Sequence, residues 1–181
     1  MNESVRTAHV GWWCESIGSL VGVILWFVAS AVLTVKFVFN DPRFDYRLLV
    51  VGVLVPDLVD VVFGGARVLH TLAFSVGLMT LIMFVTRRGS SLRRRTLPLA
   101  IGTFLHLVFD AAFANTDVFW WPVTGTSFGD ARLPVAERGA LNLVLEIFGL
   151  LGLLWIVRRH GLASASARRR FWSTGELVEG V

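Results

Sequence analysis

The chain has 181 residues, of which 55% are hydrophobic and 17% are charged. Soluble domains contain roughly 45–50% apolar and about 25% charged residues, so this composition argues against a soluble globular domain. The net charge is +4, but the basic residues are clustered and no nucleic-acid-binding motif accompanies them, so we expect no nucleic-acid partner. Cys14 is the single cysteine, which excludes an intrachain disulfide and a CxxC zinc motif. Any bound metal would therefore need histidine and carboxylate ligands.

Long apolar runs separated by short charged segments predict an all-α, polytopic membrane bundle of about five transmembrane helices. We expect a single transmembrane domain over residues 1–160, followed by a basic cytoplasmic tail over residues 161–181. The expected helices cover about residues 17–39, 48–64, 68–86, 97–114 and 139–157.

The first apolar run has an alternative interpretation as a secretory signal peptide, because Ala29-Ser30-Ala31 resembles a cleavage site. The run is longer than the apolar core of such peptides, which has about 7–15 residues, and acidic residues precede it. We therefore expect this helix to be retained.

The distribution of Lys and Arg predicts on which side of the membrane each end of the chain lies. The segment Arg87–Arg95 and the tail after the fifth expected helix are rich in arginine, and a count of five helices places both on one side. The basic side is usually cytoplasmic, so we expect the N-terminus outside and the C-terminus in the cytoplasm. Trp120 and Trp121, in the outer loop, suit the aromatic belt at the membrane interface.

Ionisable residues inside transmembrane helices are costly and usually serve a function. Asp57 and Asp60 are three residues apart and share one helix face, and His106 and Asp110, four apart, do the same. Six such side chains fall in the outer half of the bilayer when the arginine-derived orientation is applied: Asp57, Asp60, His70, His106, Asp110 and Glu146. This agreement in depth favours one polar site.

Several carboxylates in a medium of low dielectric repel one another, and a divalent cation removes that cost. Imidazole nitrogens together with carboxylate oxygens suit Zn, Mn or Fe, and the identity of the divalent metal ion stays open. Such an ion activates water for hydrolysis, with a spare carboxylate as general base.

Each of these residues also has a structural interpretation. Asp57 could pair with Arg67 at a proline kink, and His106 could belong to a hydrogen-bonded structural pair. Glu146 could join two helices together with Asn142. The residue types alone leave these alternatives open.

Two further histidines lie outside the expected helices. His160 stands in the basic tail, where we expect it to be solvated, whereas His9 is on the predicted outer side and could reach the site.

Three segments occur in a suggestive order, and a tryptophan-proline loop follows them: Val55-Pro-Asp-Leu-Val-Asp60, Leu69-His-Thr-Leu72, Gly102-Thr-Phe-Leu-His-Leu-Val-Phe-Asp110 and then Trp120-Trp121-Pro122. In this order they resemble the membrane-bound metal-dependent hydrolases typified by the inner-membrane protein YdjM. The resemblance covers roughly residues 46–125 and implies a multi-pass protein of the bacterial inner membrane.

The resemblance also implies a set of metal ligands, namely Asp57, Asp60, His70, His106 and Asp110. Arg67 and the segment Thr7-Ala8-His9 would correspond to further conserved elements of that family. The family is distantly similar to zinc-dependent phospholipase C and to P1-type nucleases, which cleave phosphoesters.

The resulting hypothesis is a membrane-embedded, metal-dependent hydrolase that acts on a phosphoester or a lipid-linked substrate. In it Arg67 would hold an anionic group of the substrate, and Glu146 or Asp117 would act as a base or orient a ligand. The first alternative is a transporter or a proton- or ion-handling protein that uses the same acids. The second is a structural or regulatory membrane protein whose arginine-rich tail binds anionic membrane lipids.

Overall fold

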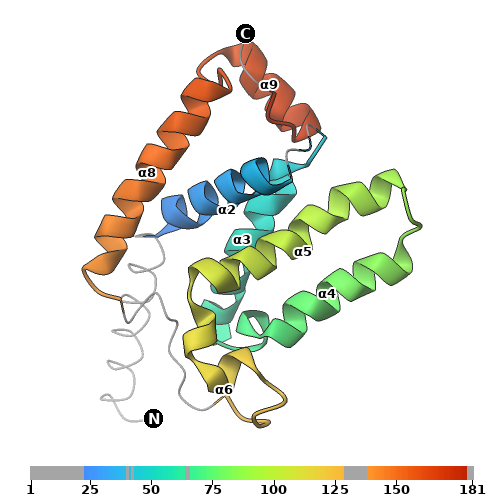
Figure 1. Cartoon of the computed structure of the whole chain (residues 1–181), viewed down its shortest axis with the longest axis vertical. Helices are drawn as coiled ribbons and strands as arrows, with labels where there is room; N and C mark the ends of the chain where they lie inside the picture. The colour runs from blue at the N-terminus through green and yellow to red at the C-terminus, as the bar shows by residue number, and fades with distance from the viewer. Residues whose placement is uncertain (1–22, 40, 42, 64–65, 129–137, 179–181) are drawn as a thin grey trace.

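The computed structural model describes residues 23–39, 41, 43–63, 66–128 and 138–178. Every regular element within these residues is helical, which confirms the all-α prediction. The α-helices are α2 (Ile24–Val38), α3 (Tyr46–Asp60), α4 (Leu72–Val85), α5 (Ser91–Phe109), α6 (Thr116–Phe119), α8 (Leu141–Arg159) and α9 (Ala165–Thr174) (Figure 1). Short 3-10 turns lie at η1 (Val61–Phe63), η2 (Val68–His70) and η3 (Ala112–Ala114).

Helices α3 and α5 approach each other closely because a glycine of each helix lies at their contact. A methyl group on Gly52 would collide with the carbonyl of Leu99, and one on Gly102 would collide with the backbone nitrogen of Val53. The close approach lets His106 of α5 reach the backbone of α3, with its Nδ1 atom 2.8 Å from the carbonyl oxygen of Val53. The two glycines thus set the distance across which the polar residues of α3 and α5 meet.

Helix α8 packs along α2, from the start of α2 to Phe37 near its end (Figure 1). A methyl group on Gly149 of α8 would collide with the backbone of Leu25 and Trp26. Three residues earlier, the Glu146 oxygens accept the backbone N–H of Leu25 at 3.2 Å and that of Trp26 at 3.0 Å. The first N–H groups of a helix lack partners within the helix. Glu146 therefore caps α2 from a neighbouring helix.

The residues after α8 fold back onto the start of α3. The carbonyl of Gly175 accepts the backbone N–H of Tyr46 at 2.9 Å, and Leu177 is buried. His160 is only 3% exposed, and its Nδ1 atom lies 3.0 Å from the carbonyl oxygen of Val178. The expectation that His160 is solvated is therefore wrong, because the C-terminal segment covers it.

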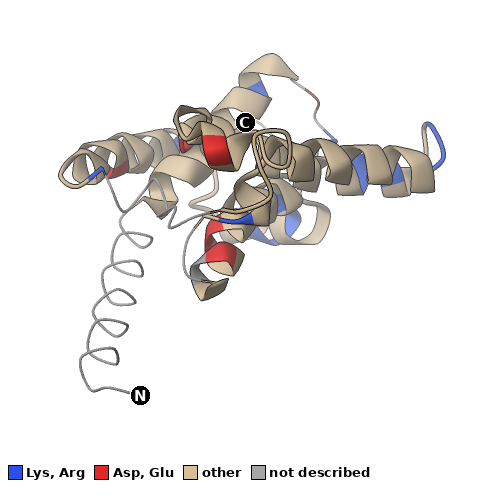
Figure 2. Cartoon of the chain, turned by 90° about the horizontal axis from the view of Figure 1, so that it is seen from below, with Lys and Arg blue, Asp and Glu red and all other residues tan. Residues whose placement is uncertain are grey.

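Helix α5 begins at Ser91, earlier than the expected start near residue 97. Ser90 caps it by accepting the backbone N–H of Arg93 at 3.2 Å. The Arg93 guanidinium donates to the carbonyl of Thr86 at 2.7 Å, which links the end of α4 to the start of α5. The arginine-rich segment is thus partly helical, and Figure 2 shows basic residues at the α4–α5 turn and in the adjoining helix.

One described helix, Leu141–Arg159, is long and apolar enough to cross a membrane. Ile24–Val38 and Leu72–Val85 are apolar but shorter. Two acids in α3 and the arginines at the start of α5 lower the hydropathy of those helices. The arrangement with five spans therefore stays a prediction.

Candidate metal centre

Two helices and a 3-10 turn bring three metal-ligating side chains together. Asp57 lies in the last turn of α3, His70 ends η2, and His106 lies near the end of α5. All three are buried, and one ligand atom of each lies within 4.8 Å of the others. This buried group could bind a metal ion, whose identity is open.

The atoms that face one another are the Nε2 atoms of both histidines and Oδ1 of Asp57. The two Nε2 atoms are 3.2 Å apart, and Asp57 Oδ1 lies 3.2 Å from His70 Nε2 and 3.4 Å from His106 Nε2. In a tetrahedral zinc site with bonds of about 2.0–2.1 Å, two ligand atoms are separated by roughly 3.3–3.4 Å. The three observed separations therefore fit three ligands of one metal ion.

The opposite nitrogen of each imidazole is held by an acceptor. His70 Nδ1 lies 2.7 Å from Asp60 Oδ2, which also accepts the backbone N–H of Arg67 at 2.8 Å. His106 Nδ1 lies 2.8 Å from the carbonyl oxygen of Val53. Carbonyl and ionised carboxylate oxygens can only accept, so each Nδ1 donates its proton. In the neutral imidazoles the two Nε2 atoms are then unprotonated and point at each other.

Two unprotonated nitrogen atoms at this distance repel each other unless a cation lies between them. Metal-binding histidines donate their second ring nitrogen to a carboxylate or a backbone carbonyl, which fixes the ring and makes the ligand more basic. His70 and His106 each have such an acceptor. The donor set and its surroundings therefore fit a divalent transition metal.

Asp110 directly follows α5 and extends the polar group. Its Oδ2 atom is buried, lies 3.9 Å from His70 Nε2 and has no hydrogen-bond partner among the described residues. Its Oδ1 atom accepts from Nη2 of Arg138 at 2.8 Å, and the same nitrogen donates to the Asp110 carbonyl. Within the described part of the chain, Arg138 Nη1 is buried without a partner. One oxygen and one nitrogen thus remain available to a ligand.

The buried carboxylates outnumber the cations that contact them. Asp57, Asp60 and Asp110 are at most 3% exposed, and among the described residues only Arg138 forms an arginine ion pair with any of them. With ionised carboxylates and neutral imidazoles, the group has two excess negative charges, which are costly away from water. A divalent cation would cancel that excess.

The other residues predicted for the site have different surroundings. Glu146 uses both carboxylate oxygens to cap α2. Asp117 is exposed in α6, and Arg67 reaches Asp60 through its backbone N–H. His9 lies outside the described residues.

Arg138 contacts Asp110 in this polar group, although the sequence did not predict it as a site residue. It lies 28 residues from Asp110, in a different segment, so no local spacing connects the two. Its one sequence signal is that it is a basic residue on the expected outer side, where such residues are few.

No protein-family model, curated protein or solved structure matches the chain.

Proposed function

We propose that this protein crosses the membrane several times, holds a divalent transition metal among its helices, and hydrolyses a phosphoester or a lipid-linked substrate there. The proposal has two parts, the membrane placement and the metal centre, and each has its own support.

The distribution of side chains supports membrane placement. Ionisable residues such as Asp57 and His106 are buried, whereas large apolar residues such as Phe84 of α4 and Phe148 and Leu151 of α8 are exposed. Soluble monomers rarely expose large contiguous apolar patches. Lipid is the surrounding phase in which apolar outer faces and a polar interior are both favourable.

The observation that carries the metal proposal is the pair of facing Nε2 atoms, 3.2 Å apart, whose rings are both fixed through Nδ1. Asp57, His70 and His106 would hold the ion. A bound divalent metal supplies Lewis acidity, which polarises a scissile phosphoryl or carbonyl group and activates water.

The surrounding residues have separate roles in this proposal. Asp60 orients His70, and the Val53 carbonyl orients His106. Asp110 Oδ2 accepts a proton from the attacking water, because it is buried without a partner among the described residues and lies 3.9 Å from His70 Nε2. Arg138 Nη1 binds an anionic oxygen of the substrate, a role that the sequence had suggested for Arg67.

The test is hydrolysis by detergent-purified protein that has been stripped with a chelator and reloaded with Zn, Mn or Fe. We expect metal-dependent cleavage of bis(p-nitrophenyl) phosphate, and loss of that cleavage in Asp110→Asn with metal content retained. Glu146→Gln is the matched control, since it removes a carboxylate that does not contact the centre.

Proton or ion handling is the second candidate function, because a proton could also occupy the space between the two Nε2 atoms. Metal-free wild-type protein that carries protons or cations across liposomes, with transport abolished by His106→Ala, would favour this function over hydrolysis.

A further inference from the structure

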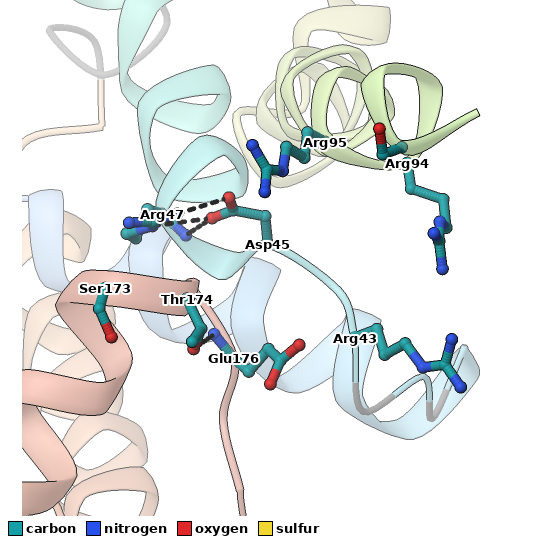
Figure 3. Close-up of a pocket in the computed structure, with 9 residues that line it drawn as sticks. Arg43, Asp45, Arg47, Arg94, Arg95, Ser173, Thr174 and Glu176 are labelled. Carbon is teal, nitrogen blue, oxygen red and sulfur yellow. Dashed lines mark hydrogen bonds and ion pairs between the residues drawn. The ribbon is translucent and has the colours of Figure 1, made fainter.

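A pocket lies at the other end of α3 and α5 from the metal centre, near the end of α9 (Figure 3). Its volume is about 330 Å³, within the range of roughly 300–1,000 Å³ typical of small-ligand sites. The charged residues of its lining are Arg43, Asp45, Arg47, Arg94, Arg95 and Glu176. Arg47 and Asp57 are ten residues apart on α3, so the two sites are about 15 Å apart along that helix.

The positive charge of this arginine pocket exceeds its negative charge. Arg47 forms two hydrogen bonds with Asp45, from Nε to Oδ1 at 3.1 Å and from Nη2 to Oδ2 at 2.9 Å. Arg47 also donates to the carbonyl of Trp172 at 2.6 Å, so its position is fixed by the structure. This pairing satisfies Asp45 and leaves Glu176 as the one other acid against three arginines.

Those three arginines, Arg43, Arg94 and Arg95, form no side-chain hydrogen bond or ion pair with any residue that the structure describes. Arg93 of the same run differs, since its guanidinium binds Thr86. Hydrogen bonds within the fold thus explain the presence of an arginine at position 93, but they do not explain Arg94 and Arg95.

The start of α5 adds to the positive potential. A helix N-terminus carries about half a positive charge, so arginines in the first turns of a helix are unfavourably placed. The first turn of α5 contains no acid that could compensate them. An anion bound in the pocket would relieve this repulsion, and Ser91 in its lining offers a hydroxyl donor.

We propose that the arginine pocket binds the phosphate group of an anionic phospholipid at the cytoplasmic face of the membrane. Exposed apolar residues that lie close in sequence to lining residues favour a lipid as the source of the phosphate. Phe37 and Val38 at the end of α2 are 71% and 68% exposed, and Trp172 of α9, next to Ser173 of the lining, is 69% exposed. Exposed tryptophan is enriched at the level of lipid headgroups. The proposal uses the membrane placement argued above and is independent of the metal centre.

Native mass spectrometry of the full chain in detergent, titrated with phosphatidylglycerol or phosphatidylcholine, tests the proposal. We expect wild type to bind phosphatidylglycerol at least roughly 10-fold more tightly, and the double variant Arg94→Gln/Arg95→Gln to lose most of that preference. Arg87→Gln/Arg88→Gln is the matched control, because it removes two exposed arginines of the α4–α5 turn that do not line the pocket. The control should keep the preference, and Arg94→Lys/Arg95→Lys should keep part of it.

Three results would overturn the proposal. Equal binding of the two lipids by wild type would show that the pocket does not recognise an anionic lipid. An equal loss of the phosphatidylglycerol preference in both double variants would show that the preference comes from general surface charge. Competition by inorganic phosphate as effective as phosphatidylglycerol would replace the lipid with a soluble phosphate. Unchanged circular dichroism and thermal unfolding in the pocket variants establish that they fold, and because neither measurement needs a bound metal, this test is separate from that of the metal centre.

Discussion

Two regions of the molecule each place an acid in an apolar helix or at its end, and they use it differently. At the junction of α2 and α8, both oxygens of Glu146 accept backbone N–H groups of α2. At the end of α5, Asp110 has one oxygen paired with Arg138, while the other is buried and has no partner within the described part of the chain. The first acid is satisfied by the fold alone, and the second is not.

This difference separates an acid whose two oxygens are both used by the fold from an acid with an oxygen left for the proposed centre. Buried polar atoms without partners are rare in folded proteins and call for a ligand, an ion or water. Replacing Glu146 should therefore affect stability, and replacing residues of the centre should affect metal binding. The predictions that follow test this separation.

The largest effect on stability should come from Gly102→Val. The added side chain would collide with the backbone of α3, so we expect the free energy of unfolding to fall by about 3 kcal/mol. We also expect no metal binding, because the collision forces α3 and α5 apart. Thermal unfolding in detergent and metal analysis measure the two effects. Gly77→Val is the control, since a methyl group on Gly77 meets no atom within 4 Å. Equal losses in the two variants would show that the α3–α5 approach is unimportant.

Asp60→Asn should weaken metal binding roughly 10- to 100-fold while the fold is kept. The amide oxygen can still accept from His70 Nδ1, but the negative charge that makes the imidazole a better ligand is lost. Competition with a chromogenic chelator measures the affinity. Asp117→Asn, which changes an exposed acid, should bind as wild type does. Wild-type metal affinity in Asp60→Asn would show that the charge of Asp60 does not support metal binding.

Glu146→Ala should cost about 2 kcal/mol of stability and leave metal content unchanged. The variant removes two charge-assisted hydrogen bonds to the start of α2. Thermal unfolding gives the stability and mass spectrometry of metals gives the content. Metal loss in a folded Glu146→Ala protein would contradict the separation between the two regions.

The smallest effect concerns Asp45, which caps α3 by accepting the backbone N–H of Arg47. Burial alone would raise the pKa of Asp45, but hydrogen bonds and the charge of Arg47 outweigh it and hold that pKa below its ordinary value. A lowered pKa means stability that is present at neutral pH and is lost as the pH falls below about 4. Asp45→Ala should therefore cost about 1 kcal/mol at pH 7.

This cost should shrink at lower pH, as unfolding curves of wild type and variant at pH 7 and pH 3 would reveal. A cost that is equal at both pH values would show that the charge of Asp45 does not stabilise the fold.

Much of the centre follows from the sequence because helical periodicity is a local property. The spacing of Asp57 and Asp60 placed them on one face of a helix, and the structure brings Asp57 to His70 and His106. Periodicity does not reveal which partners a side chain meets from other helices. It therefore could not show that Glu146 caps α2, that Arg138 pairs with Asp110, or that the tail covers His160.

The sequence predicts that the helices exist more reliably than it predicts where they begin and end. Apolar content marks α8 well, but α5 begins within the arginine run because Ser90 caps it and Arg93 binds the end of α4. Hydropathy does not register such hydrogen bonds. The same arginines lower the mean hydropathy of α5, although long basic side chains at the start of a spanning helix can extend to the membrane interface.

The measurement that tests the metal centre most directly is metal content by mass spectrometry on detergent-purified wild type, His106→Ala and Glu146→Ala. Folding of each is checked by circular dichroism. We predict about one equivalent of Zn, Mn or Fe in wild type and in Glu146→Ala, and none in His106→Ala. If wild-type protein binds no transition metal even after reconstitution, the proposed metal centre is contradicted. The alternative is then a proton shared between the Nε2 atoms of His70 and His106.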